Sequence, residues 1–252
     1  MRRIATITAV GLVALALPIA ASAQSPTSFT ADLAQANDSG ATATAEITLD
    51  GNMAEINLTG QGFFDGFPHA IHLHGEPGGD NVCPPAMNPG DPDFDAADED
   101  GDGILSVVEG APFYGGVTVS LTTEGDTTPD SALAVDRFPT SGTLDYSRTI
   151  ELPDDVAANL SSLHVVVHGL DLDGSGEIGT VEIPSSLDPD LPIEATAPAA
   201  CGQITAVAAG GIDTGAGGTA STNPLAGLLA GGLLLGGFGA FAARRRRAGE
   251  SA

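Results

Sequence analysis

Apolar residues alternate with polar ones over several short stretches in the middle of the chain, and this pattern constrains the fold more than any other feature. Phe29, Ala31 and Leu33 fall on one side of an extended segment, and the same period of two recurs over residues 45–49 and 54–58. This alternation predicts β-strands, because every second side chain of a strand lies on the same face. Similar short runs cover residues 117–121, 144–152, 163–167 and 202–207.

The connections between these runs are also typical of a β protein. Asp50-Gly51 separates two of the runs and predicts a tight hairpin. Other junctions are rich in glycine, proline and aspartate, and no stretch sustains a helical period, although residues 156–163 have room for one or two helical turns. We therefore predict an all-β fold, an antiparallel sandwich or barrel.

The charge of the chain is strongly one-sided. The sequence has no lysine, and residues 24–223 hold all but one of its 33 acidic residues and only Arg137 and Arg148 of its eight arginines, for a formal charge of −30. Such a surface repels phosphate backbones and anionic lipid headgroups and attracts divalent cations. We therefore expect metal ions as partners and no nucleic acid.

Both ends of the chain resemble targeting segments. Arg2 and Arg3 precede an apolar run that closes at Ala21-Ser22-Ala23, which predicts a secretory signal peptide over residues 1–23, with a retained anchor as the alternative. Residues 224–243 carry no charge and, at ~1.5 Å per residue, are long enough for a transmembrane helix. The arginine-rich tail, residues 244–252, is expected to stay in the cytoplasm.

These segments predict an exported, single-pass membrane protein. Its main domain, residues 24–208, would lie outside the cytoplasm, and residues 209–223, rich in glycine, alanine and threonine, would form a stalk. Gly227 and Gly231 have the small-xxx-small spacing that can pack two copies into a homodimer. In so glycine-rich a segment, the spacing also arises by chance.

All five histidines fall in two clusters, His69, His72 and His74 in one and His164 and His168 in the other. On a strand, residues i and i+2 share a face ~6.5–7 Å apart, so His72 and His74 can bind one metal ion. His168 is the obvious candidate for a third ligand, whereas His164 lies ~13 Å from it along a strand, too far to share its metal. The alternative is that these are ordinary core or surface histidines.

The chain has two cysteines, Cys83 and Cys201. Because an exported protein folds in an oxidising compartment, we expect them to form one disulfide. That bond would tie the loop after the first histidine cluster to the last strand of the domain.

Taken in order, several motifs resemble the copper/zinc superoxide dismutases over roughly residues 29–207. They are His69-x-x-His72-x-His74-Gly, Cys83, Pro85-Ala-Met-Asn-Pro89, Val165-Val-Val-His168 and Ala200-Cys201-Gly202. The resemblance implies a Greek-key antiparallel β sandwich or barrel with an intrasubunit disulfide between the two cysteines. It also implies that His72, His74 and His168 are copper ligands and that His69 is a structural, hydrogen-bonding residue.

Other residues depart from this family. Ala86 stands where the histidine that bridges copper and zinc belongs, and no histidine lies between His74 and His164, so zinc is not expected. Pro198 stands where the arginine that guides superoxide belongs. Met87 is interpreted as a core residue, with a soft copper ligand as the alternative.

Two acidic segments match the twelve-residue calcium loop of an EF-hand. Each has glycine at position six for the sharp turn and glutamate at position twelve to close the site; the alternative is an acidic turn without an ion. Pro112 soon follows the first segment and a strand precedes the second, so we expect neither to have flanking helices. The candidate ligands are Asp98, Asp100, Asp102, Ser106 and Glu109 in the first loop and Asp171, Asp173, Ser175 and Glu182 in the second.

Two functions fit these patterns. The first is an extracytoplasmic, membrane-anchored copper protein that resembles superoxide dismutase and has residual or altered redox activity, superoxide dismutation included, with calcium ordering its acidic loops in place of zinc. The second is a non-catalytic, calcium-stabilised surface module for adhesion or copper sequestration. The three histidines favour the first, whereas Ala86, Pro198 and the negative charge favour the second.

Overall fold

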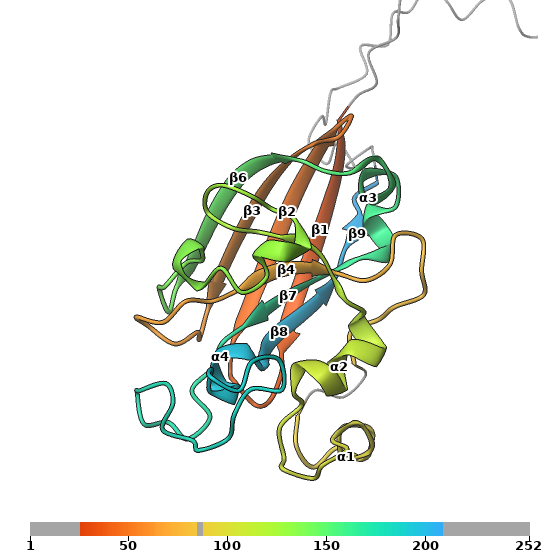
Figure 1. Ribbon diagram of the computed structural model, residues 1–252. Coiled ribbons are helices and arrows are strands. Elements are labelled where there is room, and N and C mark those ends of the chain that lie inside the picture. Colours follow the sequence, from red (N-terminus) through yellow and green to blue (C-terminus); the bar gives the residue numbers. More distant parts are fainter. Residues whose placement is uncertain (1–25, 85–87, 209–252) are drawn as a thin grey trace, which may run out of the picture. The chain divides into compact units, whose positions relative to one another are not determined.

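The computed structural model describes residues 26–84 and 88–208, and its central feature is a nine-stranded antiparallel sheet (Figure 1). From one edge to the other, the strands are β5 (Val117–Ser120), β4 (Ile71–His74), β7 (His164–His168), β8 (Pro198–Gln203), β1 (Thr27–Gln35), β2 (Thr42–Asp50), β3 (Met53–Gln61) and β6 (Leu144–Glu151). The ninth strand, β9 (Thr205–Ala206), pairs with β1. The prediction of a mostly β, antiparallel fold is confirmed.

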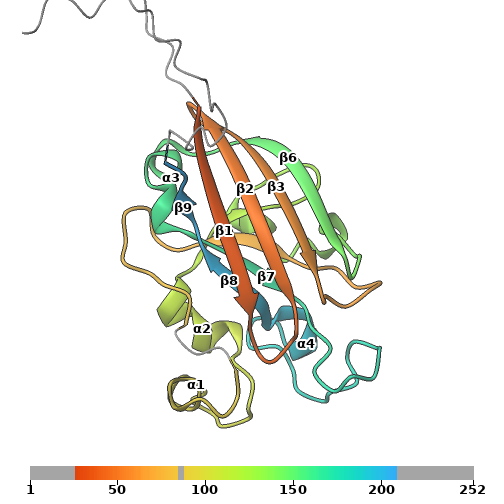
Figure 2. The same ribbon diagram turned by 180° about the vertical axis from the view of Figure 1, so that it is seen from behind.

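The sheet is curled into a half-barrel, so that one face encloses the core. In two opposite views, β1, β2, β3 and β6 lie over β4, β7 and β8 (Figures 1 and 2). Ile56 and Leu58 of β3 join Leu73 of β4 and Val165 of β7 in one buried cluster. The edge strand β6 is tied to the segment that follows β5, because the Arg148 guanidinium donates to the Thr122 carbonyl at 2.7 Å.

The local sequence pattern accounts well for the long hairpin. The alternating residues of β1, β2 and β3 give alternating buried and exposed side chains, as a strand with one face on the core requires. Asp50 pairs with Met53, so the turn between β2 and β3 has two residues, and Gly51 supplies a φ of +60°. Glycine adopts this left-handed conformation without the clash that a Cβ would cause.

Helices are few and short. The helical turns predicted within residues 156–163 correspond to α3 (Asp154–Ala158) and the 3₁₀ turn at Leu160–Ser162. The expectation that neither acidic loop has flanking helices is wrong for the first, which runs from the end of α1 (Pro92–Ala97) to the start of α2 (Val107–Tyr114). At 6 and 8 residues, these helices are too short to show a helical period in the sequence.

The predicted signal peptide, stalk, transmembrane helix and tail lie outside the described residues, and so does the Ala86–Met87 segment of the family comparison. Within residues 26–84 and 88–208, no helix has both the length and the apolar character that crossing a bilayer requires.

Candidate metal centre

Three histidines meet on the outer face of the curled sheet. β4 and β7 are antiparallel neighbours, with His74 opposite His164 in the register. Leu73 and Val165 belong to the core, so the alternation of the strands turns His72 and His74 to the opposite face. His168, at the end of β7, joins them there, and one nitrogen from each of the three rings lies within 4.8 Å of the others. The structure thus brings together the three histidines that the sequence predicts as a metal site.

The triad, by which we mean His72, His74 and His168, is buried beneath the loops that cover this face. The exposed fractions of the three side chains are 4%, 1% and 3%. The ring centroid of His168 lies 5.1 Å from that of His72 and 5.5 Å from that of His74. The two Nε2 atoms of His74 and His168 are 3.4 Å apart. Protonating rings that lie this close together and this deeply buried is energetically unfavourable.

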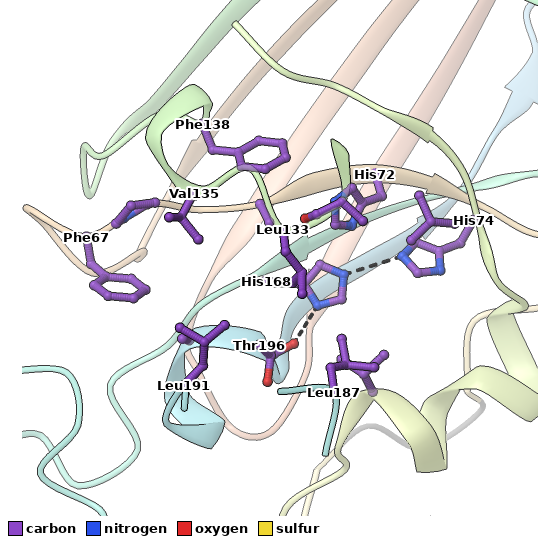
Figure 3. Close-up of a pocket in the computed structure, with 16 residues that line it drawn as sticks. Phe67, His72, His74, Leu133, Val135, Phe138, His168, Leu187, Leu191 and Thr196 are labelled. Atoms are coloured by element: carbon purple, nitrogen blue, oxygen red, sulfur yellow. Dashed lines mark hydrogen bonds between the residues drawn. The ribbon is translucent and has the colours of Figure 1, made fainter. Parts of the chain in front are cut away.

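Each ring of the triad is held by a backbone carbonyl from a different segment of the chain. His72 Nε2 lies 3.1 Å from the Ala132 oxygen, His74 Nδ1 lies 2.9 Å from the Gly115 oxygen, and His168 Nδ1 lies 2.7 Å from the Thr196 oxygen. Figure 3 shows the contact between His168 and Thr196. A carbonyl oxygen can only accept, so each of these nitrogens carries the proton. These bonds fix the tautomer and orientation of each ring, as outer-shell partners do at metal sites.

The opposite nitrogen of each ring is therefore left with a free lone pair. These atoms are His72 Nδ1, His74 Nε2 and His168 Nε2. The last two face each other at 3.4 Å, and His72 Nδ1 is buried without a hydrogen-bond partner within residues 26–84 and 88–208. A buried polar atom without a partner is rare in a folded protein. A metal ion satisfies it, because the neutral imidazole is a ligand for copper, zinc, iron and nickel. The donor set thus fits a first-row transition metal.

Electrostatics keeps these rings neutral. Burial lowers the pKa of His74 to about 3 and that of His168 to about 4. The pKa of His72 is also lowered well below its ordinary value, first by burial and then by the neighbouring His168 and His74. A proton on one ring would be repelled by the others and could not be hydrated. At neutral pH, the triad therefore presents lone pairs rather than charges.

One side of the triad opens into a pocket with apolar walls (Figure 3). Three loops contribute Phe67, Leu133, Phe138 and Leu191 to these walls. A metal held by the triad would have three protein ligands and one position facing this pocket. Sites of that kind admit a further ligand, unlike the closed four-ligand sites with a structural role.

The other two histidines lie outside the triad. His69 is fully buried, with Nδ1 3.1 Å from the His168 oxygen and Nε2 2.6 Å from the Phe64 oxygen. It therefore joins the loop before β4 to the end of β7, behind the ligand His168. His164 is buried opposite His74 but does not belong to the metal-binding group.

The predicted disulfide is confirmed. Cys83 and Cys201 are bonded, with their Cα atoms 6.0 Å apart. Cys201 is buried on β8, where it packs with Tyr114 and Val166, and Cys83 lies in the loop after β4. The bond therefore attaches that loop to the centre of the sheet, close to the strand that carries His168.

In the first acidic loop, carboxylates crowd around a tight turn. Asp98, Asp100 and Asp102 each place an oxygen within 4.8 Å of the others. Glu109 Oε1 accepts a hydrogen bond from the Glu99 backbone at 2.8 Å, and its Oε2 accepts one from Ser106, which begins α2. The pKa of Asp102 is raised, first by burial and then by its acidic neighbours. Ser106 itself caps the helix and does not join the acidic group.

In the second acidic loop, the structure gathers a different set from the one the spacing predicts. Asp171 and Asp173 lie with Glu194, whereas Glu182 is exposed and does not join them. Glu194 sits on α4 (Ile193–Thr196), is fully buried, and accepts hydrogen bonds from the backbone of Leu172 at 3.1 Å and of Gly179 at 2.7 Å. Its carboxylate thus lies inside the loop.

Sequence reasoning missed Glu194 and the three carbonyls that hold the triad. Glu194 lies beyond the twelve-residue loop, and its only signal is an acid next to the apolar Ile193 and Ala195. Backbone carbonyls leave no signal in a sequence, because every residue has one.

No protein-family model and no curated protein sequence matches this chain. The curled antiparallel sheet, the triad and the disulfide are compatible with the resemblance to copper/zinc superoxide dismutases.

Proposed function

We propose that this chain is an exported copper protein, in which the triad holds one copper ion with one coordination position open to a small molecule. The observation that carries the proposal is the set of three buried lone pairs, each fixed by a carbonyl on the far side of its ring. Copper is chosen because imidazole-rich sites bind it most strongly among divalent first-row metals. Copper would supply one-electron redox chemistry at the pocket floor.

The absence of a carboxylate from the triad supports copper over a non-haem iron site. Iron sites of the facial type combine two histidines with one carboxylate. Among the described residues, no acid lines the pocket around His72, His74 and His168. The resemblance to copper/zinc superoxide dismutases points to the same three ligands.

Export to an oxidising compartment is part of the proposal. It is supported by the Cys83–Cys201 disulfide, because such bonds persist outside the cytoplasm. The predicted signal peptide, residues 1–23, and the apolar segment, residues 224–243, would place the domain outside and anchor it there.

The experiment is elemental analysis of the full-length protein after exposure to copper, zinc and calcium, followed by desalting. We expect one copper per chain, no stoichiometric zinc, and calcium in addition. Calcium without copper would contradict the copper site and would favour the alternative of a calcium-stabilised surface module. One zinc per chain would contradict the choice of metal.

We further propose that calcium occupies the two acidic loops. In the first, the crowded carboxylates and the glutamate at position twelve fit the oxygen-rich ligand set that calcium prefers. In the second, we propose that Glu194 takes the closing role that the sequence spacing gives to Glu182. Outside the cell, even a site of ~10⁻⁴–10⁻³ M affinity would be filled.

Two matched variants test the second loop. In a Glu109→Gln background, which weakens the first loop, Glu194→Gln is expected to lower calcium affinity on the order of tenfold, because it removes a charged ligand. Glu182→Gln removes the same charge from an exposed side chain and is expected to change the affinity less than about threefold. Calorimetric titration measures both. A larger loss for Glu182→Gln would show that the sequence spacing, rather than the structure, identifies the ligand.

A further inference from the structure

Among the residues that the structure describes, no charged one lines the pocket above the triad. Apart from the three histidines, its lining is apolar except for the Thr196 side chain. The loop before β4 contributes Phe67, and the loop between β5 and β6 contributes Leu133 and Phe138. The loop before α4 contributes Leu187 and Leu191. Three separate loops thus contribute the same kind of surface (Figure 3).

The mouth of this pocket is also apolar. Leu133 and Val135 are each 43% exposed, and Leu187 is 48% exposed. They are three of the seven large apolar side chains that are exposed within residues 26–84 and 88–208. The domain surface is otherwise strongly acidic, so this group of exposed apolar side chains makes the pocket entrance more apolar than the surface around it.

The two arginines of the domain are both engaged elsewhere. The Arg137 guanidinium donates to the Glu124 and Asp126 carbonyls and to the Ser131 hydroxyl, and that of Arg148 donates to carbonyls at Thr122 and Gly125. Neither lines the pocket. Apart from the metal ion itself, an anion that entered would meet no cationic group among the described residues of the walls, and it would approach through the field of residues 24–223, whose formal charge is −30.

We infer that the open position over the triad selects electrically neutral small molecules, such as uncharged diatomic gases, and disfavours anions, superoxide included. The inference rests on the proposed copper site and names the class of ligand that this site takes. A neutral molecule makes apolar contacts with these low-dielectric walls, and it avoids the large free-energy cost of removing an ion from water.

The test compares a neutral probe with an anionic one on the full-length protein, after its copper content has been measured. Carbon monoxide is titrated into the copper(I) form and followed by the infrared C–O stretch. Azide is titrated into the copper(II) form and followed by its charge-transfer absorption. We expect carbon monoxide to saturate at one per copper. Azide is expected to bind weakly, and more tightly as salt screens the repulsion from the acidic surface.

A pair of lysine substitutions isolates the effect of charge at the mouth. Leu133→Lys places an ammonium group at the rim and is expected to strengthen azide binding on the order of tenfold. Met53→Lys adds the same charge in place of a similarly exposed apolar side chain on β3, outside the pocket, and is expected to change azide affinity less than twofold. Carbon monoxide affinity should be unchanged in Met53→Lys.

The outcomes separate the inference from the function on which it rests. A chain that takes up no copper overturns the proposed function and the inference together. A copper-loaded chain that binds azide at low salt as readily as Leu133→Lys does, or that binds azide but no carbon monoxide, overturns the inference and leaves the copper site standing.

Discussion

Replacing His168 with alanine is expected to abolish stoichiometric copper binding while leaving calcium binding unchanged. The substitution removes one of three lone pairs and leaves His72 and His74 as a pair of ligands in a buried pocket. Loss of an outer-shell partner alone typically costs 10–100-fold in metal affinity, so loss of a ligand should cost more than about 100-fold. Competition against a coloured copper chelator gives the affinity, and calorimetry with calcium shows that the acidic loops still bind.

His164→Ala is the matched control for this prediction. His164 is a buried histidine on the same strand as His168, yet it lies outside the triad. We expect its replacement to change copper affinity less than about threefold, since it removes no ligand. If His164→Ala loses copper as completely as His168→Ala does, the loss reflects damage to β7 and not the removal of a ligand. Unchanged copper affinity in His168→Ala would contradict the assignment of the site.

Removing the disulfide is expected to cause the largest loss of stability. Cys83 and Cys201 are 118 residues apart in the sequence, so their bond restricts a long loop of the unfolded chain. The chain-entropy model gives about 5 kcal/mol for a loop of this length, an amount comparable with the whole stability of many domains. Urea unfolding of the Cys83→Ala/Cys201→Ala double variant, compared with the oxidised wild type, measures the difference.

The reduced wild-type protein provides the control for the disulfide prediction. A thiol reductant should move the unfolding midpoint of the wild type toward that of the double variant and leave the variant itself unchanged. A difference in unfolding free energy below about 1 kcal/mol would contradict the prediction, and would mean that the unfolded chain is already restricted without the bond. Copper content measured on the same samples shows whether the disulfide between the loop after β4 and strand β8 is also needed for the triad to bind copper.

The strands were predictable because their signal is local. A strand that packs one face on a core needs an apolar residue at every second position, and β1, β2 and β3 meet this requirement residue by residue. Asp50-Gly51 likewise encodes its own turn. The fully buried strand β7 is a continuous apolar run between two histidines. Its sequence does not alternate, so the prediction of this strand rested on the apolar run.

The helices around the first acidic loop were not predicted, although the sequence contains residues typical of helix N-termini. Asp91 and Pro92 begin α1, and Ser106 and Glu109 form a capping box at the start of α2. These signals occur in a stretch where the acids also match a calcium loop, and the helices are too short for periodicity to separate the two interpretations. Short helices are stabilised by packing, here of Phe94 and Leu105, which depends on the folded chain.

In the candidate site, too, local features were predictable from the sequence, whereas contacts between distant segments were not. That His72 and His74 share a face follows from their spacing, because two residues on one strand are related by strand geometry alone. His168 was a candidate third ligand from the sequence, and the folded chain places its ring beside the other two. The three carbonyls that fix the rings, the entry of Glu194 into the second acidic loop and the apolar pocket are visible only in the folded chain. These contacts join segments distant in the sequence, and their partners are set by the curl of the sheet and the paths of its loops, which no local spacing encodes.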